Sequence, residues 1–263
     1  MMDSPESNQH HADDYDATIA SNAFDSYMDR WERRHVREIV TKLFPGKIPR
    51  YLDFACGTGR LTAVIAPLAA EVVGIDITES MLRKAEERIP SARFVQGDLT
   101  TEDHRLGTFD LVSSFRFFGN APAELRSAVL RAMNPLLRKG GFLLINNHRN
   151  PLAIANLLHR VRGSDAPAES PGHTGDSQSP WGWCNTLTNR TLSRILKQAG
   201  FSILEARPIA VWQYRARMMV TAGSNPGLEQ RLERLFRARA WLTLAPDAVI
   251  LAEKVRDLDH AQR

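Results

Sequence analysis

The chain has 263 residues, of which 43% are hydrophobic and 24% charged, and its net charge at pH 7 is +4. This composition is typical of an ordinary globular protein, and the sequence shows no signal-peptide pattern, no apolar run near the roughly 18 residues of a membrane span, and no metal-binding or disulfide pattern around Cys56 and Cys184. We therefore expect a cytoplasmic protein that does not span a membrane.

The first predicted element is a helix near the start of the chain. Residues 1–20 are polar and predict a loose tail. Over residues 21–43 apolar side chains recur at helical spacing, and Pro45 and Gly46 end the pattern. We expect residues 1–48 to form an N-terminal tail and a helical cap.

Residues 49–148 alternate between strand-like and helix-like segments. Short runs rich in β-branched and aromatic residues precede amphipathic segments throughout this stretch. The strand-like runs are YLDF, VVGID, ARFVQGD, FDLVSSF and GFLLIN. This alternation of strands and helices at regular spacing predicts βαβ units. It therefore predicts an α/β fold whose parallel sheet is covered by helices on both faces.

The regular alternation of strand-like and helix-like segments ends after residue 148. Residues 149–185 combine an amphipathic helix with a stretch rich in Ser, Pro, Gly and Asp, and they predict an inserted helix and a flexible lid, or else a plain surface excursion. Residues 186–263 fit a C-terminal completion of the same domain, with helices over 188–200 and 227–242, each followed by a strand. The second of these helices has one apolar side, formed by Leu228, Leu232, Leu235 and Phe236.

Residues 51–62, YLDFACGTGRLT, combine an apolar strand with a turn that contains Gly57 and Gly59. A strand that ends in such a turn and opens a helix presents free backbone N–H groups to a ligand. A dinucleotide fingerprint requires a third glycine, where this chain has Thr62. A phosphate-binding loop requires a lysine followed by Ser or Thr, where this chain has Arg60 followed by leucine. The turn therefore fits neither kind of phosphate site.

Three carboxylates lie at the predicted strand ends. Asp53 precedes the glycine turn, where it can meet an ammonium group directly or through water. Asp76 ends the second strand and is placed to accept hydrogen bonds from two ribose hydroxyls. Asp98 follows the third strand and can accept from the exocyclic amine of adenine. Each acid could instead serve as a helix cap or turn residue, but together they suit a cationic ligand that carries ribose and adenine.

In combination these segments resemble the class I S-adenosylmethionine-dependent methyltransferases, in particular their small-molecule branch with ubiquinone- and menaquinone-methyltransferase-like cores. The segments that carry the resemblance are LDFACGTGRLT, VVGIDITESMLRKAEERI, FVQGDLT, FDLVSSF and LLRKGGFLLIN, with a looser match at LKQAGFSILEA. The resemblance implies a Rossmann-like, doubly wound, mostly parallel sheet of seven strands with helices on both faces. It also implies S-adenosyl-L-methionine as the cofactor and S-adenosyl-L-homocysteine as its product.

The same resemblance implies which residues hold the cofactor. The family usually has a glycine at the position of Ala55, and alanine is a mild departure that leaves the two central glycines in place. The implied cofactor-binding residues are Asp53, Ala55, Gly57 and Gly59 around the methionyl part, Asp76 at the ribose, Ile77 and Met81 beside the adenine, Asp98 and Leu99 at its amine, and Phe115.

Acceptor-side residues are expected after the fourth and fifth strands, where open α/β sheets bind their ligands. His148 is the candidate general base because imidazole titrates near neutrality, and a capping or surface histidine is the alternative. Arg116 and Arg149 could bind an anionic acceptor or form ordinary ion pairs. Phe118 and Asn147 complete the candidate substrate-binding set, with core packing as the alternative for the phenylalanine.

The leading prediction is methyl transfer to an oxygen or nitrogen of a small organic acceptor by in-line displacement. An RNA or protein methyltransferase is the second hypothesis. Nucleic acid is the less favoured partner, because SSFRFFGN lacks the Asn/Asp-Pro-Pro-aromatic signature and neither cysteine lies in a Pro-Cys motif. A noncatalytic S-adenosylmethionine-binding protein is the third hypothesis. We expect no metal site, and either a monomer or a homodimer.

Overall fold

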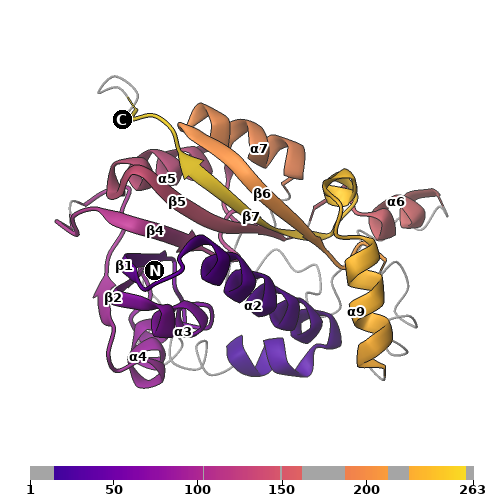
Figure 1. Cartoon of the computed structure of the whole chain (residues 1–263), viewed down its shortest axis with the longest axis horizontal. Helices are drawn as coiled ribbons and strands as arrows, with labels where there is room; N and C mark the ends of the chain where they lie inside the picture. The colour runs from indigo at the N-terminus through magenta and orange to yellow at the C-terminus, as the bar shows by residue number, and fades with distance from the viewer. Residues whose placement is uncertain (1–14, 103, 149, 162–186, 213–224, 259–263) are drawn as a thin grey trace, which may run out of the picture.

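Seven strands form one sheet in the order β3-β2-β1-β4-β5-β7-β6 (Figure 1). The computed structural model describes residues 15–102, 104–148, 150–161, 187–212 and 225–258. The strands pair in parallel except β7, which is antiparallel to both β5 and β6. The strands are β1 Ile48–Phe54, β2 Ala69–Asp76, β3 Arg93–Gln96, β4 Phe109–Ser114, β5 Leu137–His148, β6 Phe201–Ile209 and β7 Asp247–Lys254. The predicted mostly parallel sheet is confirmed.

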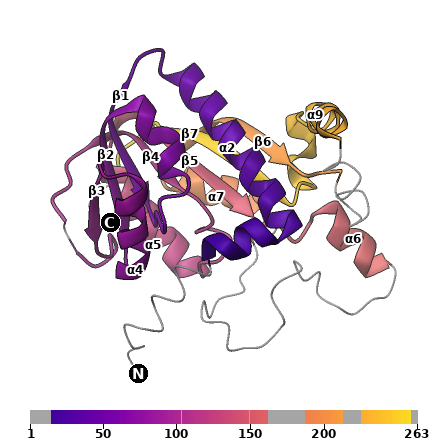
Figure 2. The ribbon, with the colours of Figure 1, turned by 90° about the horizontal axis from the view of Figure 1, so that it is seen from below.

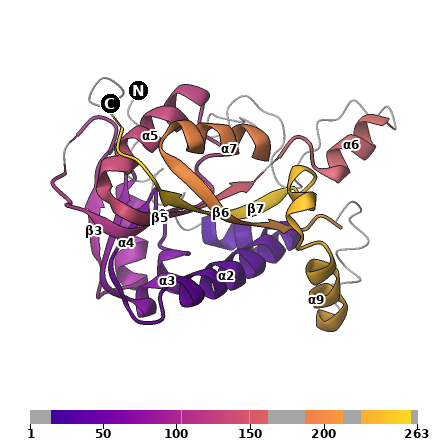
Figure 3. The ribbon, with the colours of Figure 1, turned by 45° about the horizontal axis from the view of Figure 1, so that its top comes forward.

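Helices cover both faces of this sheet. Helices α2 and α3 lie on one face, and α5 and α7 lie on the other (Figures 1 and 3). Helix α6 stands away from the sheet beyond its edge (Figure 2). The helices are α2 Ala23–Leu43, α3 Thr62–Ile65, α4 Glu79–Arg88, α5 Ala123–Leu136, α6 Ile154–Val161, α7 Asn189–Gln198 and α9 Pro226–Leu235, with short 3-10 turns at Ala66–Leu68 and Arg239–Thr243.

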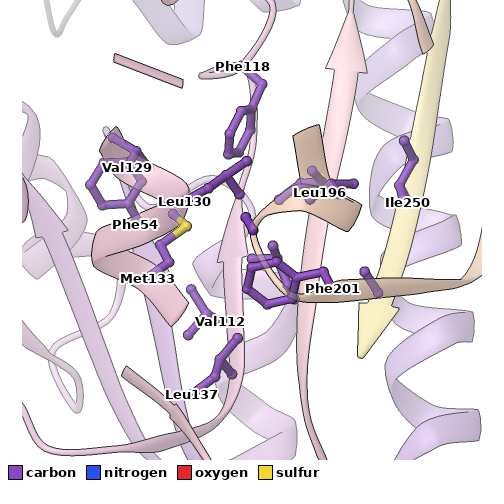
Figure 4. Packing of buried hydrophobic residues seen from close by; sticks show 14 of the residues in the cluster. Phe54, Val112, Phe118, Val129, Leu130, Met133, Leu137, Leu196, Phe201 and Ile250 are labelled. Atoms are coloured by element: carbon purple, nitrogen blue, oxygen red, sulfur yellow. The ribbon is translucent and has the colours of Figure 1, made fainter. Parts of the chain in front are cut away.

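The sheet separates two apolar cores, because successive side chains of a strand point to opposite faces. In β1, Tyr51 packs toward α2 and Leu52 toward α5, and both are fully buried. The α5-side core joins side chains of β1, β4, α5, α7, β6 and β7, as Figure 4 shows for Phe54, Val112 and Phe201 among others. The α2-side core includes residues of α2, β1, β6 and β7, so the N-terminal helix is part of the same folded unit.

The ends of the parallel strands define one edge of the sheet, here called the carboxyl edge. Strands β1 to β5 end there, and β6 ends there too because it is antiparallel to β7. Strand β7 runs the other way and therefore begins at this edge. Its first residue, Asp247, lies in register with His148 at the end of β5 and with Ile209 at the end of β6.

Three predicted boundaries are corrected by the structure. Residues 15–21 are helical rather than a loose tail. The predicted helix after the glycine turn is only four residues long, because Pro67 cannot continue it and β2 begins at Ala69. Helix α9 ends at Leu235 rather than at residue 242. By contrast, Asn22 caps α2 as the predicted helix start requires, accepting backbone bonds from the first turn.

Candidate cofactor and acceptor site

The turn after β1 is held in backbone conformations that favour glycine. Ala55, Gly57 and Gly59 have φ angles of 52°, 53° and 73°. The left-handed conformation costs an alanine roughly 1–2 kcal/mol, which explains why glycine would suit the first of these positions. A Cβ added to Gly59 would lie 3.1 Å from the Cβ of Ala85 in α4. The turn therefore needs its glycines both for conformation and for its contact with α4.

Asp76, the last residue of β2, joins two backbone segments at the carboxyl edge. Its Oδ2 accepts a hydrogen bond of 2.8 Å from the N–H of Gly57, and its Oδ1 accepts one of 2.9 Å from the N–H of Thr78. Burial raises the pKa of Asp76 above its ordinary value, although these two bonds oppose the shift. Each carboxylate oxygen can accept more than one bond. Asp76 can therefore brace the turn and still accept from a ligand hydroxyl.

Asp53 is enclosed beneath the same turn. Its side chain accepts hydrogen bonds of 2.5 Å from the hydroxyls of Thr62 and Ser113, and the hydroxyl of Tyr51 lies 2.7 Å from that of Ser113. Asp53 is only 3% exposed. Burial raises its pKa to about 6, against the opposing effect of the two hydroxyl donors. Both oxygens thus already have donors from within the fold, and the residue links β1, α3 and β4.

The candidate adenine residues lie around the ends of β2 and β3. Asp98 Oδ1 accepts from the backbone N–H of Thr100 at 2.8 Å and from its hydroxyl at 2.7 Å. Ile77 is 68% exposed, whereas Met81 is buried and Leu99 is half-buried. An exposed isoleucine that directly follows Asp76 offers an apolar surface that a planar ligand can cover.

A segment expected to be loose lies against the glycine turn. Residues 15–21 are helical, and Asp16 accepts a hydrogen bond of 2.9 Å from the hydroxyl of Thr58. The other oxygen of Asp16 accepts one of 2.5 Å from Arg88 of α4. Arg88 also donates to the carbonyl of Thr58 at 2.6 Å. The N-terminal helix is therefore anchored to the turn by polar contacts, which the amino-acid pattern alone did not predict.

A buried carboxylate from α2 connects the turn with the opposite side of the edge. Glu32 is fully buried. It accepts from Arg60, which follows the turn, at 2.9 Å, and from Asn146 Nδ2 in β5 at 2.6 Å. The Nε of Arg116, beyond β4, lies 3.7 Å from Glu32 Oε2. Two guanidinium groups and an amide therefore surround one carboxylate.

Arg116, a predicted acceptor-side residue, lies within this cluster. Its φ angle is 59°, its N–H donates to Asn146 Oδ1 at 2.6 Å, and its guanidinium pairs with Asp25 at 3.3 Å. Burial opposes its charge, but the carboxylates of Glu32 and Asp25 outweigh that effect and raise the pKa of Arg116 above its ordinary value. The preceding Phe115 is buried in the α2-side core.

Two other predicted acceptor-side residues have structural contacts. Asn147 is fully buried, and its amide donates to the carbonyl of Leu187 and to Asn189 Oδ1, each at 2.7 Å. These bonds attach β5 to the start of α7. Phe118 is fully buried in the α5-side core, with its ring edge-on to Phe117. Its contacts are those of a packing residue.

His148, the predicted base, is half-buried at the end of β5. Its ring lies against Gly119, where an added Cβ would be 3.0 Å from Nδ1 of the histidine. Because His148 is in register with Asp247, the two side chains leave the sheet on the same face. Arg149 and most of the predicted lid, residues 162–185, lie outside the described residues.

A second buried carboxylate holds α9 in place. Glu233 Oε1 accepts from Tyr27, from the N–H of Ala210 at 3.0 Å and from the indole N–H of Trp212 at 2.9 Å. Glu233 is 4% exposed, and burial raises its pKa to about 7. Ala210 itself has a φ of 60°. The aromatic residue Tyr27 therefore packs toward α9 and β6.

Sequence reasoning did not identify Glu32, Asp247 or Glu233. The clearest available signal was in α2, where Glu32 lies four residues from both Met28 and Val36 on the buried face. A carboxylate on the apolar face of a helix requires buried partners. Within the described part of the chain, no group of three or more His, Cys, Asp or Glu residues could hold a metal ion. Among the same residues, no helix is both long and apolar enough to cross a membrane.

Comparison with known proteins identifies the family. A sequence model of methyltransferase domains matches residues 52–141. An uncharacterised methyltransferase of Synechocystis is 31% identical over 169 residues, which cover 61% of this chain and 69% of that protein. This chain belongs to the class I S-adenosylmethionine-dependent methyltransferases. Its cofactor is S-adenosylmethionine.

Other relatives match a smaller part of their own length, or match in fold alone. The trans-aconitate 2-methyltransferase of Variovorax paradoxus is 29% identical over 143 residues, and the demethylmenaquinone methyltransferase of Beutenbergia cavernae is 34% identical over 126. The matched regions span about half of each relative, 53% and 50%. The crystal structure of magnesium protoporphyrin IX methyltransferase from Synechocystis with bound S-adenosylhomocysteine has a TM-score of 0.58 at 15% identity, covering 88% of this chain and 85% of that one. That likeness concerns the fold.

Proposed function

We propose that this methyltransferase transfers a methyl group to an oxygen or nitrogen of a small organic acceptor at the carboxyl edge of its sheet. The observation that carries the proposal is the shared edge: the glycine turn, Asp76 and the buried cluster around Glu32 all lie there. The names of the relatives support a small acceptor, since they refer to trans-aconitate and demethylmenaquinone. We further propose that the enzyme acts in the cytoplasm, as a monomer or a homodimer.

The cofactor site would be formed by the residues on the β1–β3 side of the edge. When bound, S-adenosylmethionine supplies the methyl group that is transferred. Gly57 and Gly59 would let the ligand approach the backbone, and Asp76 would accept from ribose hydroxyls while it keeps the turn in place. Ile77 would cover one face of the adenine, and Asp98 would accept from its amine. Asp53 would act through the turn, because it is only 3% exposed and its oxygens accept from Thr62 and Ser113.

The acceptor would bind on the β4–β5 side of the same edge. An anionic acceptor would have to compete with Asp25 and Glu32 for Arg116, whose charge those two residues neutralise. We therefore favour an acceptor whose reacting group is a neutral hydroxyl or amine. The acceptors to be screened include compounds that carry an anionic group elsewhere in the molecule. His148 is one candidate for accepting a proton from it.

The test is transfer of radiolabelled methyl groups from S-adenosylmethionine into three pools: small molecules from a cell extract, RNA, and protein. Label that depends on the enzyme should enter the small-molecule pool. An Asp76→Ala variant assayed at the same cofactor concentration provides the control for cofactor dependence. Label in RNA or protein, with none in small molecules, would replace the proposed acceptor class with a macromolecular one.

A further inference from the structure

Within the described part of the chain, two buried polar atoms on the α2 side of the carboxyl edge have no hydrogen-bond partner. They are Nε of Arg116, which follows β4, and Oδ1 of Asp247, which begins β7. The unpartnered Ser114 Oγ and Asn147 Oδ1 lie on the opposite face of the sheet. Ser114 and Asn147 are fully buried, and Asp247 is 1% exposed. Native proteins pair nearly all such atoms, so a pair of exceptions at a ligand-binding edge indicates a polar partner that binds there.

Asp247 is the acidic member of this pair. It reaches the edge because β7 is inserted antiparallel between β5 and β6, so that its first residue lies beside the last residues of both neighbours. It lies on the α2 face of the sheet, where the negative charge of Glu32 acts on it. No Lys or Arg forms an ion pair with Asp247 among the described residues. The side chain is therefore a buried carboxyl beside a second carboxyl.

Glu32 and Asp247 have unequal surroundings. Glu32 receives hydrogen bonds from Arg60 and Asn146 and faces Arg116, whereas Oδ1 of Asp247 has no donor. Burial first, and the negative charge of Glu32 second, raise the pKa of Asp247 well above its ordinary value. The carboxylate that already has donors can supply charge, and the carboxyl group without a donor can accept a proton. A carboxylate with a raised pKa is also a stronger base.

We propose that Asp247 is the catalytic residue that accepts the proton of the methyl acceptor, which is therefore a hydroxyl or N–H compound. This inference rests on the proposed function. The acceptor's O–H or N–H donates to the unpartnered Oδ1 of Asp247. As that bond breaks, its proton passes to Asp247 and its electron pair stays on the oxygen or nitrogen, which bonds to the methyl carbon. The electron pair of the broken carbon–sulfur bond stays on sulfur, so one proton is released per turnover.

Several other charged or titratable groups face this position. They are Glu32 from α2, Arg116 after β4 and His148 at the end of β5. His148 is the competing proton acceptor, and it must be tested beside Asp247. Since Asp247 is only 1% exposed, the acceptor can reach it only if side chains that cover it move.

The first experiment measures binding, so that it does not depend on turnover. The full chain saturated with S-adenosylhomocysteine is titrated near neutral pH with phenol and anisole, benzyl alcohol and benzyl methyl ether, and aniline and N,N-dimethylaniline. In each pair the second compound lacks the proton that Asp247 would accept. We expect wild type to bind at least one parent about tenfold more tightly than its methylated counterpart. Asp247→Asn should reduce that preference to less than about threefold, whereas His148→Gln should keep it.

The outcomes separate the two proposals. If wild type does not bind S-adenosylhomocysteine, both the proposed function and the role of Asp247 are overturned. If it binds, but no parent is preferred or Asp247→Asn keeps the preference, only the role of Asp247 is overturned. Retained S-adenosylhomocysteine binding in Asp247→Asn also shows that the variant is folded.

A pH–rate profile provides a measurement that does not need the Asp247 variant to fold. With the preferred parent compound as acceptor, the wild-type rate should rise with pH through one ionisation above the ordinary range of aspartate. The same rise should persist in His148→Gln, and Asp247→Asn, where it folds, should lose it with about a 100-fold or greater fall in rate. If the rise is lost in His148→Gln, the proton acceptor is His148 and not Asp247. A wild-type rate that does not depend on pH would overturn the proposed role of Asp247.

Discussion

The carboxylate of Asp76 accepts a hydrogen bond of 2.8 Å from the backbone N–H of Gly57, nineteen residues earlier in the chain. This bond links the end of β2 to the turn after β1, across two strands that pair in parallel register. It fixes a turn whose φ angles favour glycine, and it keeps an ionisable group at the carboxyl edge. The residue proposed to hold the ribose therefore also shapes the backbone that would receive the rest of the cofactor.

Replacing Asp76 tests this double role. We expect Asp76→Ala to weaken S-adenosylmethionine binding by roughly 1.5–3 kcal/mol, about ten- to a hundredfold, because hydrogen bonds to a charged group are lost. Titration calorimetry measures the change. Glu71→Gln is the matched control, since Glu71 precedes Asp76 in the same strand and makes a half-exposed ion pair with Arg50. Equal affinities for Asp76→Ala and the control would remove Asp76 from the site.

Gly59→Ala should destabilise the turn. The φ of 73° is unfavourable for alanine, and the new Cβ would lie 3.1 Å from Ala85. We expect a loss of about 1–2 kcal/mol in the free energy of unfolding, with weaker cofactor binding. Gly46→Ala is the control, because nothing lies within 4 Å of its added Cβ and its φ is not positive. Urea unfolding measures both, and similar values for the two variants would contradict the conformational argument.

Asp53 should make the stability of the protein depend on pH in an unusual direction. Its pKa of about 6 in the folded state exceeds the ordinary value of 3.8, so the folded protein binds the proton more tightly than the unfolded chain. Its contribution therefore favours folding below about pH 4 and is lost as the pH rises from about 4 to about 6. Across that range, wild type should lose up to about 3 kcal/mol relative to Asp53→Asn.

Urea unfolding of wild type and Asp53→Asn at several pH values between 4 and 7 measures this difference. The comparison with the variant removes the contributions of the other carboxyl groups. A difference that stays constant with pH, or one that grows in favour of wild type as the pH rises, would show that Asp53 is not a buried carboxyl with a raised pKa.

Glu233 should stabilise α9 through its acceptor oxygen rather than its charge. Glu233→Leu leaves the donors of Tyr27, Ala210 and Trp212 without their partner, and we expect a loss of about 3 kcal/mol in unfolding free energy. Glu233→Gln keeps an acceptor oxygen and should cost about 1 kcal/mol or less. Urea unfolding near neutral pH distinguishes the two. Equal losses in both variants would mean that the charge itself is required.

The sheet and the cofactor turn were predictable because their signals are local. Buried parallel strands give short apolar runs, and βαβ units repeat them at regular spacing. The glycine turn and the acids Asp76 and Asp98 each follow such a run directly. Their meeting at one edge follows from the parallel arrangement alone, without any knowledge of side-chain contacts.

The acceptor side was less predictable because it depends on contacts between distant segments. Asp247 reaches the carboxyl edge only because β7 is antiparallel, and it meets Glu32 from the other end of the chain. Helix α9 shows the same limit. Its spacing predicted one apolar side that includes Leu228 and Leu235, and these two residues are 39% and 68% exposed. Glu233 is instead buried, and its three donors come from α2 and the segment after β6.

The most direct test of the central claim is isothermal titration of the full chain with S-adenosylmethionine, S-adenosylhomocysteine and NAD. We expect both sulfur compounds to bind with dissociation constants in the micromolar range and NAD not to bind, because the turn lacks the third glycine of a dinucleotide site and three carboxylates lie at the strand ends. Binding of NAD, with neither sulfur compound bound, would contradict the assignment of the glycine turn and of Asp76.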